Sequence, residues 1–265
     1  MSAARLHAAI AEALAAHPGL TELAVQTSSY GSEIPHLFGT MRVAGTVIWA
    51  TDLIETRSTD DGGKGAPDTV RYTYSASLAV LLSARPIREV RRIWADGKLL
   101  RGAGGDFKAA TGFRLYLGSE TQAPDPLIAS AVGPGRATAM RGQAYAVFEG
   151  LQLADFANRI PSLTFEVVAD EGWVDPADIA AAMGEGRVSG EGPLGPPLGG
   201  FSAYGGSRAA VLETLAAASG GWFAAEGGGV GCAAGAGRRL WSRIRGWAAR
   251  GACARWRRRT RRPSP

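Results

Sequence analysis

The 265-residue sequence has few of the residues that most often carry catalysis or metal binding, with only 2 cysteines and 3 histidines. Cys232 and Cys253 both lie near the C-terminal end, so residues 1–231 contain neither a disulfide nor a thiol nucleophile. His7, His17 and His36 all lie near the N-terminus and lack metal-ligand spacing. These absences argue against a disulfide scaffold, a thiol enzyme and a histidine-based metal centre. We expect His36 to pack or to contact solvent.

Long hydrophobic runs are also absent. No stretch approaches the ~18 apolar residues that a membrane-spanning helix needs. Arg5, His7 and Glu12 interrupt the N-terminal region, which therefore does not read as a secretory signal. A hydrophobic content of 46% is enough for a packed core. We therefore expect a globular protein that begins its life in the cytoplasm.

The net charge of +5 hides an uneven distribution along the chain. Residues 231–265 carry 11 arginines and no acidic residue, whereas residues 1–230 carry 18 basic and 24 acidic residues. The mildly acidic body predicts no specific nucleic-acid binding. The Arg-rich tail leaves non-specific binding of anions open.

Strand-like segments separated by Gly, Pro and Asp fill most of the region from Leu23 to Val168. Two long runs, Met41–Ile54 and Thr69–Leu82, are rich in β-branched and aromatic residues, and the second alternates with period two. A Gly/Asp-rich loop is expected between them at Ser58–Asp68. A hairpin is expected around Asp96-Gly97, a pair typical of the type I′ turn. Its strands, and three further ones, are predicted at Arg88–Trp94, Lys98–Arg101, Phe113–Leu117, Gln143–Phe148 and Leu163–Ala169.

Four helices are predicted from periodicity and capping residues. The first is an amphipathic helix at Ala3–Ala16, and the second is Asp125–Ala131, with Pro126 in its first turn. The third is Asp175–Met183, capped by Asp175, and the fourth is Ser207–Ser219, capped by Ser207. Between the last two, Gly184–Gly200 is rich in Gly and Pro and predicts a linker or an extended arm.

These patterns predict an α+β fold that is predominantly β. We divide the chain into an N-terminal helix (1–22), a β-rich domain (23–170), a helix with a Gly/Pro-rich linker (171–200), the start of an incomplete second domain (201–226) and a disordered basic tail (227–265).

The composition of the tail allows two interpretations. The abrupt change to Gly/Ala-rich and then Arg/Trp-rich sequence is typical of a GC-rich gene read out of frame, and we expect that the native protein continues differently after about Glu226. The alternative is a genuine basic arm, whose Trp241, Trp247 and Trp256 would stack on bases or lie at a lipid interface.

No catalytic, cofactor-binding or metal-binding residue is predicted. Gly62-Gly63-Lys64-Gly65 lacks the spacing of a phosphate-binding loop. The acidic pairs Asp60-Asp61 and Asp170-Glu171 would need partners from other segments to act in glycoside cleavage. Trp49 and Trp94 lie inside apolar strands, where core packing is favoured over carbohydrate stacking.

Tyr145, Phe148 and Phe165 alternate with smaller residues and are also predicted to lie in the core.

One ordered series of motifs carries a family resemblance. The motifs are Ser29-Tyr30-Gly31, Gly39–Thr51, Arg92–Lys98, Gln122–Pro126, Arg141–Glu149 and Asn158–Val167. In this order and spacing they resemble the first hub domain of long-tailed phage tail-tip proteins, including the large tail-hub protein of gene transfer agents and related siphophages.

The resemblance implies a β-rich hub fold and a structural role. Such proteins form a ring, a trimer when complete, at the tail-tip or baseplate hub, where the tail tube ends. They contact the distal-tail and other tip proteins and, indirectly, the host envelope, and they serve host specificity and DNA delivery. We therefore expect no enzyme and no cofactor. We also expect the chain to travel from the cytoplasm of the producing bacterium to the particle. A ring subunit should further leave an apolar patch open.

The sequence departs from the family at several places. Ser83–Ile87 stands where the family typically has Cys-Glu-Gly before a small residue and Ile. Met140 replaces a usual Tyr, and Ala157 replaces a usual Gly. The large downstream domains have no counterpart, so we expect a truncated copy. The alternative functions are a glycan-binding or hydrolytic tail-tip module that acts on the cell envelope, and a non-functional prophage remnant.

Overall fold

A computed structural model describes residues 33–60, 69–133, 135–184, 188–190, 194–204, 207–226 and 229–234. This part of the chain is mostly β, with two five-stranded antiparallel sheets, a smaller third sheet and three short α-helices. The predicted α+β, predominantly β class is therefore confirmed. The predicted helix at Ala3–Ala16, the Ser29-Tyr30-Gly31 motif, the Gly62–Gly65 loop and residues 235–265 lie outside the described residues.

The first five-stranded sheet has the order β11-β1-β9-β5-β6. Its strands are β11 (Gly200–Ala203), β1 (His36–Ala44), β9 (Leu163–Val168), β5 (Glu89–Ala95) and β6 (Lys98–Arg101). Each neighbouring pair is antiparallel.

The hairpin between β5 and β6 forms as predicted. Its turn residues Asp96 and Gly97 have φ values of 49° and 80°. A type I′ turn requires positive φ at both central positions, and Asp-Gly supplies them at low cost.

The second five-stranded sheet has the order β2-β4-β8-β7, and β3 pairs with the outer part of β4. Its strands are β2 (Thr46–Ala50), β4 (Thr69–Ser83), β8 (Ala144–Gln152), β7 (Gly112–Tyr116) and β3 (Ile54–Asp60). β3 therefore includes the first three residues, Ser58–Asp60, of the predicted Ser58–Asp68 loop.

The predicted run Met41–Ile54 is divided among three strands instead of forming one. The first break is at Gly45, where a Cβ atom would collide with the side chains of Val80 and Phe165. The chain crosses here from one five-stranded sheet to the other, so the residue must be small. Composition alone does not show such a break, because the residues on both sides favour strands.

The main core lies between the two sheets. Leu78, Val80 and Phe148 from one sheet pack against Ile93 and Phe165 from the other, and all are fully buried. Burial of each such side chain contributes about 1.5–3 kcal/mol. The aromatic residues Tyr145, Phe148 and Phe165 are at most 1% exposed, which confirms their predicted place in the core.

A second unit follows Asp170. It contains α3 (Pro176–Gly184), α4 (Arg208–Ser219) and a three-stranded sheet in the order β10-β13-β12. β11 also belongs to this unit, because its Phe201 and Ala203 lie in the second core, although β11 pairs with β1 of the first sheet. The predicted caps are present, because Asp175 accepts from the backbone N–H of Ala177 and Ser207 accepts from that of Ala210. A separate core includes the fully buried side chains of Ile179, Leu194 and Leu215.

The expectation of a linker or arm at Gly184–Gly200 is wrong for the residues described there. Val188–Gly190 forms β10, and Leu194 is completely buried in the second core. Leu198 exchanges two backbone hydrogen bonds with Val174. The segment is held by its apolar side chains and backbone pairing, which outweigh the Gly and Pro content that suggested an arm.

The strand β12 (Gly221–Glu226) continues into a hairpin with β13 (Gly229–Ala234). The prediction of a disordered tail from residue 227 is therefore wrong for Gly229–Ala234. Strand pairing uses the backbone, so a Gly/Ala-rich sequence can join a sheet without a clear side-chain pattern.

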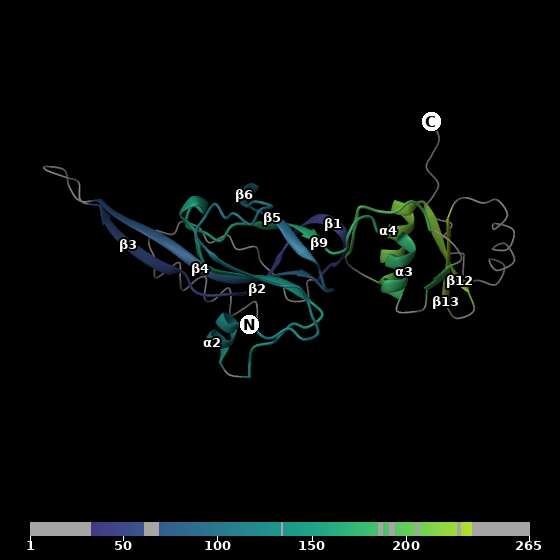
Figure 1. Cartoon of the computed structure of the whole chain (residues 1–265), viewed down its shortest axis with the longest axis horizontal. Coiled ribbons are helices and arrows are strands. Elements are labelled where there is room, and N and C mark those ends of the chain that lie inside the picture. The colour runs from purple at the N-terminus through teal and green to yellow at the C-terminus, as the bar shows by residue number, and fades with distance from the viewer. Residues whose placement is uncertain are drawn as a thin grey trace, which may run out of the picture.

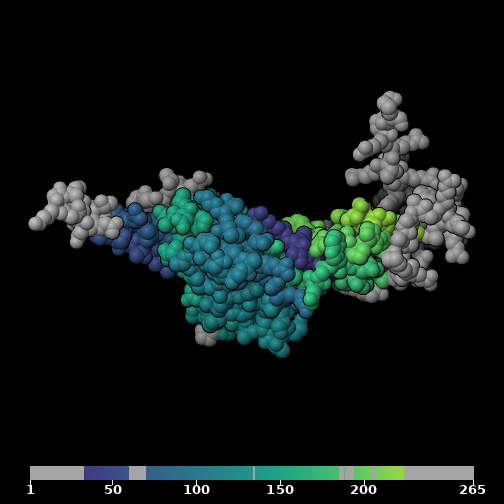
Figure 2. Space-filling model, turned by 45° about the horizontal axis from the view of Figure 1, so that its top comes forward, coloured from purple at the N-terminus to yellow at the C-terminus, as the bar shows by residue number. Residues whose placement is uncertain are grey.

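The molecule is elongated (Figure 1), with the β3–β4 hairpin at one end and the second unit at the other. The short helix α2 (Pro126–Val132) lies against the second sheet, and the 3-10 helix Ala154–Phe156 follows β8. On the face shown in Figure 2, residues of β1 lie between the broad body and the second unit.

Candidate functional site

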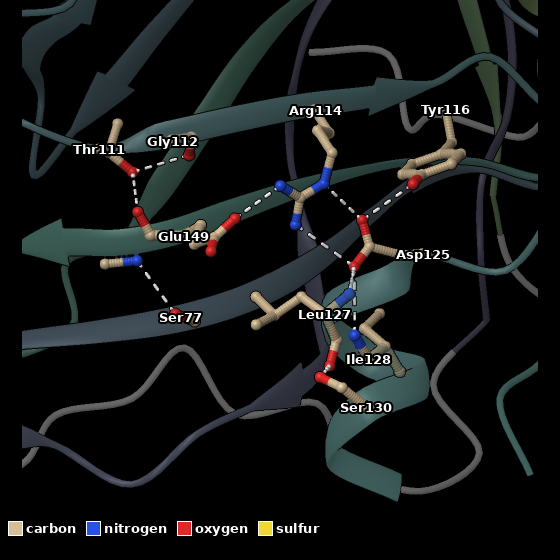
Figure 3. A network of polar contacts seen from close by, with 11 residues as sticks. Ser77, Thr111, Gly112, Arg114, Tyr116, Asp125, Leu127, Ile128, Ser130 and Glu149 are labelled. Carbon is tan, nitrogen blue, oxygen red and sulfur yellow. Dashed lines mark hydrogen bonds and ion pairs between the residues drawn. The ribbon is translucent and has the colours of Figure 1, made fainter. Parts of the chain in front are cut away.

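A network of polar side chains is centred on Arg114 of β7 (Figure 3). Its Nε donates to Oδ2 of Asp125 at 2.7 Å, and its Nη1 donates to Oε2 of Glu149 at 2.6 Å. The hydroxyl of Tyr116 donates to the same Asp125 oxygen at 2.9 Å. The ring of Tyr116 in turn stacks on Tyr145, with centroids 4.4 Å apart.

Asp125 is the buried member of this network and the N-cap of α2. Its side chain is 0% exposed, and its Oδ1 accepts from the backbone N–H groups of Leu127 and Ile128. Burial opposes ionisation, but hydrogen bonds from Arg114 and Tyr116 outweigh it and hold the pKa of Asp125 below its ordinary value. Burial and the bond to Asp125 raise the pKa of Tyr116 to about 12.

The network fits a structural clamp better than a general base. Both oxygens of Asp125 accept from donors that are themselves fixed, so the carboxylate has no lone pair directed at a reactant. The contacts tie the start of α2 to β7, and Glu149 adds a link to β8.

Gln122 lies in the same Gln122–Pro126 motif as Asp125 and holds a neighbouring loop in place. Its side-chain amide donates to the carbonyl oxygens of Ala139 at 2.8 Å and Met140 at 2.7 Å, and its own oxygen accepts from the N–H of Gly118 at 3.0 Å. The anchored loop includes Met140, whose φ is 49°. Within the Gln122–Pro126 motif, both Gln122 and Asp125 therefore organise neighbouring backbone.

A third polar cluster lies where β1 meets the second unit. Arg85 donates from Nη1 and Nη2 to the two carboxylate oxygens of Asp170, at 2.7 and 2.9 Å. Asp170 also accepts from the N–H of Gly39 at 3.0 Å, and Arg85 also donates to the carbonyl of Leu37 at 2.7 Å. The guanidinium lies 4.4 Å from the ring centroid of Phe38.

The acidic pairs considered in the sequence are not brought together as a catalytic pair. Asp170 is held by Arg85, and Glu171 forms an exposed ion pair with Arg88 at 2.7 Å. Asp60 ends β3, while Asp61 lies outside the described residues. Across the described part of the chain, no three His, Cys, Asp or Glu side chains form a group that could hold a metal ion.

Of the two tryptophans predicted to pack in the core, Trp49 packs against a small core cluster, and the position of Trp94 needs correction. Trp94 is only half-buried, and the guanidinium of Arg42 lies 4.0 Å from its ring centroid. Trp49 is also half-buried and packs at the edge of a small cluster with Ala79 and Tyr145. Both lie on sheet faces turned away from the main core, a direction that apolar flanking residues do not reveal.

His36 is half-buried in β1, which agrees with the prediction that it packs or contacts solvent. Burial, followed by the nearby charge of Arg85, lowers its pKa. Of the helices described, none is long and apolar enough to cross a membrane.

The outer β3–β4 hairpin, called the arm below (Ile54–Asp60 with Thr69–Tyr74), carries exposed apolar side chains. Along β4, Tyr74 is 3% exposed, but the next residues on the same face, Tyr72 and Val70, are 47% and 37% exposed. Ile54 is 56% exposed on the opposite face. The alternation in the sequence indicates an apolar face along β4. It does not show at which residue other parts of the protein stop covering that face.

Taken together, the structure defines a β-rich protein whose described polar clusters stabilise its own fold. No protein-family model and no curated protein matches the chain. A solved chain from the "virion of native gene transfer agent (GTA) particle" is similar, with a TM-score of 0.56 and 28% sequence identity. The match covers 77% of this chain and 54% of the solved chain, so the present chain spans about half of that protein's length. The chain therefore resembles a component of a gene transfer agent virion.

Proposed function

We propose that the chain is a structural component of the tail-tip or baseplate hub of a gene transfer agent or siphophage-like particle. The observation that carries this proposal is the similarity to a chain of a gene transfer agent virion over 77% of the present chain. The hub assignment rests on the motifs that resemble tail-hub proteins. Two of these motifs, Arg92–Lys98 and Asn158–Val167, pair in the structure as β5 and β9.

The sheet edges support self-assembly into a ring. In the described part of the chain, β7 and β2 end the same sheet on opposite sides, and all its neighbouring strands are antiparallel. The path from β2 to β7 has four alternating strands, so β7 of one copy would meet β2 of the next in an antiparallel sense. Such a head-to-tail contact generates rings and covers edges that would otherwise stay exposed.

The arm supplies the expected open apolar patch. A two-stranded hairpin is at best marginally stable in water without further packing. Tyr72 and Val70 continue the buried face of β4 past the cover that the described part of the chain provides. We assign this stripe to a contact with a second copy, and the remaining ring surfaces to the distal-tail and other tip proteins.

Self-association of the purified full chain tests the assembly surface. Light scattering after size-exclusion chromatography should show trimers or larger rings that dissociate in the double variant Val70→Lys/Tyr72→Lys. The control Thr56→Lys/Ser58→Lys adds the same charge to the opposite face of the arm and should assemble like the wild type. Circular dichroism checks that each variant is folded. A wild type that stays monomeric up to millimolar concentration would contradict the assembly proposal.

Location in the particle tests the hub role itself. An epitope-tagged chain, expressed in the producing bacterium, should co-purify with nuclease-treated particles, and immunogold label should lie at the distal end of the tail. Label on the capsid would overturn the hub assignment. Absence from particles would favour the prophage-remnant alternative.

The alternative of an envelope-directed tip module has one observation in its favour. Trp173 is 74% exposed, and its ring lies against Gly199, which leaves an indole face open to solvent. Exposed aromatic faces of this kind stack on sugars. Loss of sacculus binding in Trp173→Ala would favour a glycan-binding module, and clearing on peptidoglycan zymograms would favour a hydrolase. The hub proposal assigns the chain no catalytic step and expects neither result.

A further inference from the structure

The strand β1 belongs to both units of the molecule. Its residues Thr40–Ala44 pair with β9 of the first unit, and His36–Gly39 pair with β11 of the second. The alternation of side chains sends Leu37 into the main core and Phe38 into the second core. Among the described residues, β1 with β11 is the only strand pairing that joins the two units.

Gly39 lies at the point where β1 changes partner. Its φ is +67°, and a Cβ atom there would collide with the carbonyl oxygen of Gly199. The next residue, Thr40, donates its N–H to that same carbonyl at 2.8 Å. The backbone therefore bends at a residue with unusual rotational freedom.

Arg85 and Asp170 both form hydrogen bonds with the backbone of β1 beside this bend. Arg85 follows β4 and Asp170 follows β9, so both are placed by the first unit. Asp170 binds the N–H of Gly39, while Arg85 binds the carbonyl of Leu37 and covers the ring of Phe38. Asp170 is also the residue at which the chain leaves for the second unit.

The ion pair is accessible although its geometry is well defined. The contact is bidentate, yet the two side chains are 28% and 30% exposed. Neither residue belongs to either hydrophobic core. The pair can thus separate without the opening of a core, which distinguishes it from the buried Arg114–Asp125 clamp.

We propose that Arg85 and Asp170 form a latch that fixes the angle between the two units at the β1–β11 junction. With the latch closed, the bidentate contact and the Phe38 contact hold the second unit in one orientation. With the latch open, the pairing of His36–Gly39 with β11 loosens and the second unit changes its angle, while the rest of each core stays folded. This inference does not depend on the role proposed for the chain in a particle.

Hydrogen exchange of the full chain separates a latch from a general stabilising contact. In Asp170→Asn, amides of residues 36–40, 171–175 and 200–203 should exchange about tenfold faster, whereas those of β4, β8 and α4 keep their wild-type rates. The control Glu171→Gln removes the adjacent carboxylate, which is 84% exposed, and should change none of these rates. Equal acceleration throughout the molecule, or none at the junction, would overturn the latch.

A distance measurement tests the orientation directly. Spin labels at Lys98→Cys and Glu213→Cys, both at exposed positions, are introduced after Cys232 and Cys253 are replaced by serine. The parent protein should give one narrow distance distribution, and Asp170→Asn should give a broad one. Arg85→Lys offers a milder second variant, since lysine keeps the charge but loses the bidentate contact. Narrow, unchanged distributions in both variants would overturn the latch.

Discussion

Among the residues that the structure describes, four that are not glycine hold positive φ values: Asp96, Met140, Ala157 and Asn158. Asp and Asn tolerate the left-handed region because their short polar side chains bond locally, whereas Ala and Met gain no such contact. Ala157, at φ 54°, ends the 3-10 helix Ala154–Phe156 and is exposed. Glycine at this position would avoid the backbone strain that the alanine carries.

Ala157→Gly should therefore stabilise the protein. Relief of the left-handed alanine contributes about 1–2 kcal/mol, and the added freedom of the unfolded chain offsets about 0.5–1 kcal/mol of it. We expect a net gain of about 0.5–1 kcal/mol in the free energy of unfolding, measured by urea titration. The control Ala154→Gly, at an exposed position with ordinary backbone, should lose a similar amount. A loss of stability in both variants would show that the backbone of Ala157 does not destabilise the folded state.

Asp125→Asn tests the buried clamp. Asparagine can still cap α2, but Arg114 loses the anion that binds it, and we expect a loss of about 2–3 kcal/mol at neutral pH. Glu149→Gln removes the other carboxylate from the same guanidinium. Because Glu149 is 49% exposed, this variant should lose at most about 1 kcal/mol. Equal losses in the two variants would contradict the assignment of Asp125 as the main anchor.

The pH dependence of the same pair follows from the lowered pKa of Asp125. A carboxyl group whose pKa is lower in the folded state stabilises the protein fully above its unfolded pKa, about 4, and loses this contribution as pH falls through the folded value. The stability difference between wild type and Asp125→Asn should thus be constant from about pH 7 to 5 and shrink below about pH 4. Urea titrations across this range measure it. A stability difference between wild type and Asp125→Asn that increases below about pH 4 would contradict a lowered pKa for Asp125.

At the residue scale, the sequence predicted local roles better than distant partners. The helix start at Asp125-Pro126 and the caps at Asp175 and Ser207 depend on neighbouring residues, and the structure confirms them. The partners of Arg85 and Arg114 depend on which strands meet. Arg85 was noted only as part of a departure from the family, because Asp170 is 85 positions away in the chain.

At the scale of elements, turn chemistry allowed the β5–β6 hairpin to be predicted almost residue by residue. The order of the strands was not predicted, because pairings such as β1 with β9 join segments more than a hundred positions apart. The division of Met41–Ile54 at Gly45 was also missed. A glycine inside an apolar run does not by itself show whether the strand continues or crosses to another sheet.

Gly39→Ala tests the bend within β1. Alanine at this position must keep a positive φ, and its methyl group would collide with the backbone of Gly199. β1 and β11 therefore cannot keep their register. We expect a loss of about 3 kcal/mol or more, with faster hydrogen exchange in β11. The control Gly97→Ala also has positive φ, but its Cβ would have no neighbour within 4 Å. It should lose only about 1–2 kcal/mol. Similar losses would show that the close approach to Gly199 is unimportant.

At the scale of the whole molecule, the sequence predicted a β-rich first domain and understated the second unit. The glycine and proline content of residues 184–200 predicted a linker. Instead, Leu194 and the Val174–Leu198 pairing attach the described parts of that segment to the core of the second unit. The burial of Leu194 depends on α3 and α4, which lie on either side of it in the sequence. Composition averages over such residues and therefore favours a linker.

Two separate cores joined through one strand should not unfold in a single step. Leu215→Ala removes a fully buried side chain of the second core and should cost about 2–5 kcal/mol there. Thermal unfolding followed by calorimetry should show an earlier transition for the second unit, while amides of β4 and β8 remain protected through it. Leu78→Ala, the matched change in the main core, should instead lower the transition of the first unit. Because multi-unit proteins depart from two-state behaviour when their interfaces are small, the separation of the two transitions measures how strongly β1 and the Arg85–Asp170 pair couple the units. One cooperative transition that both variants shift equally would mean that the shared strand merges the two cores into one folding unit.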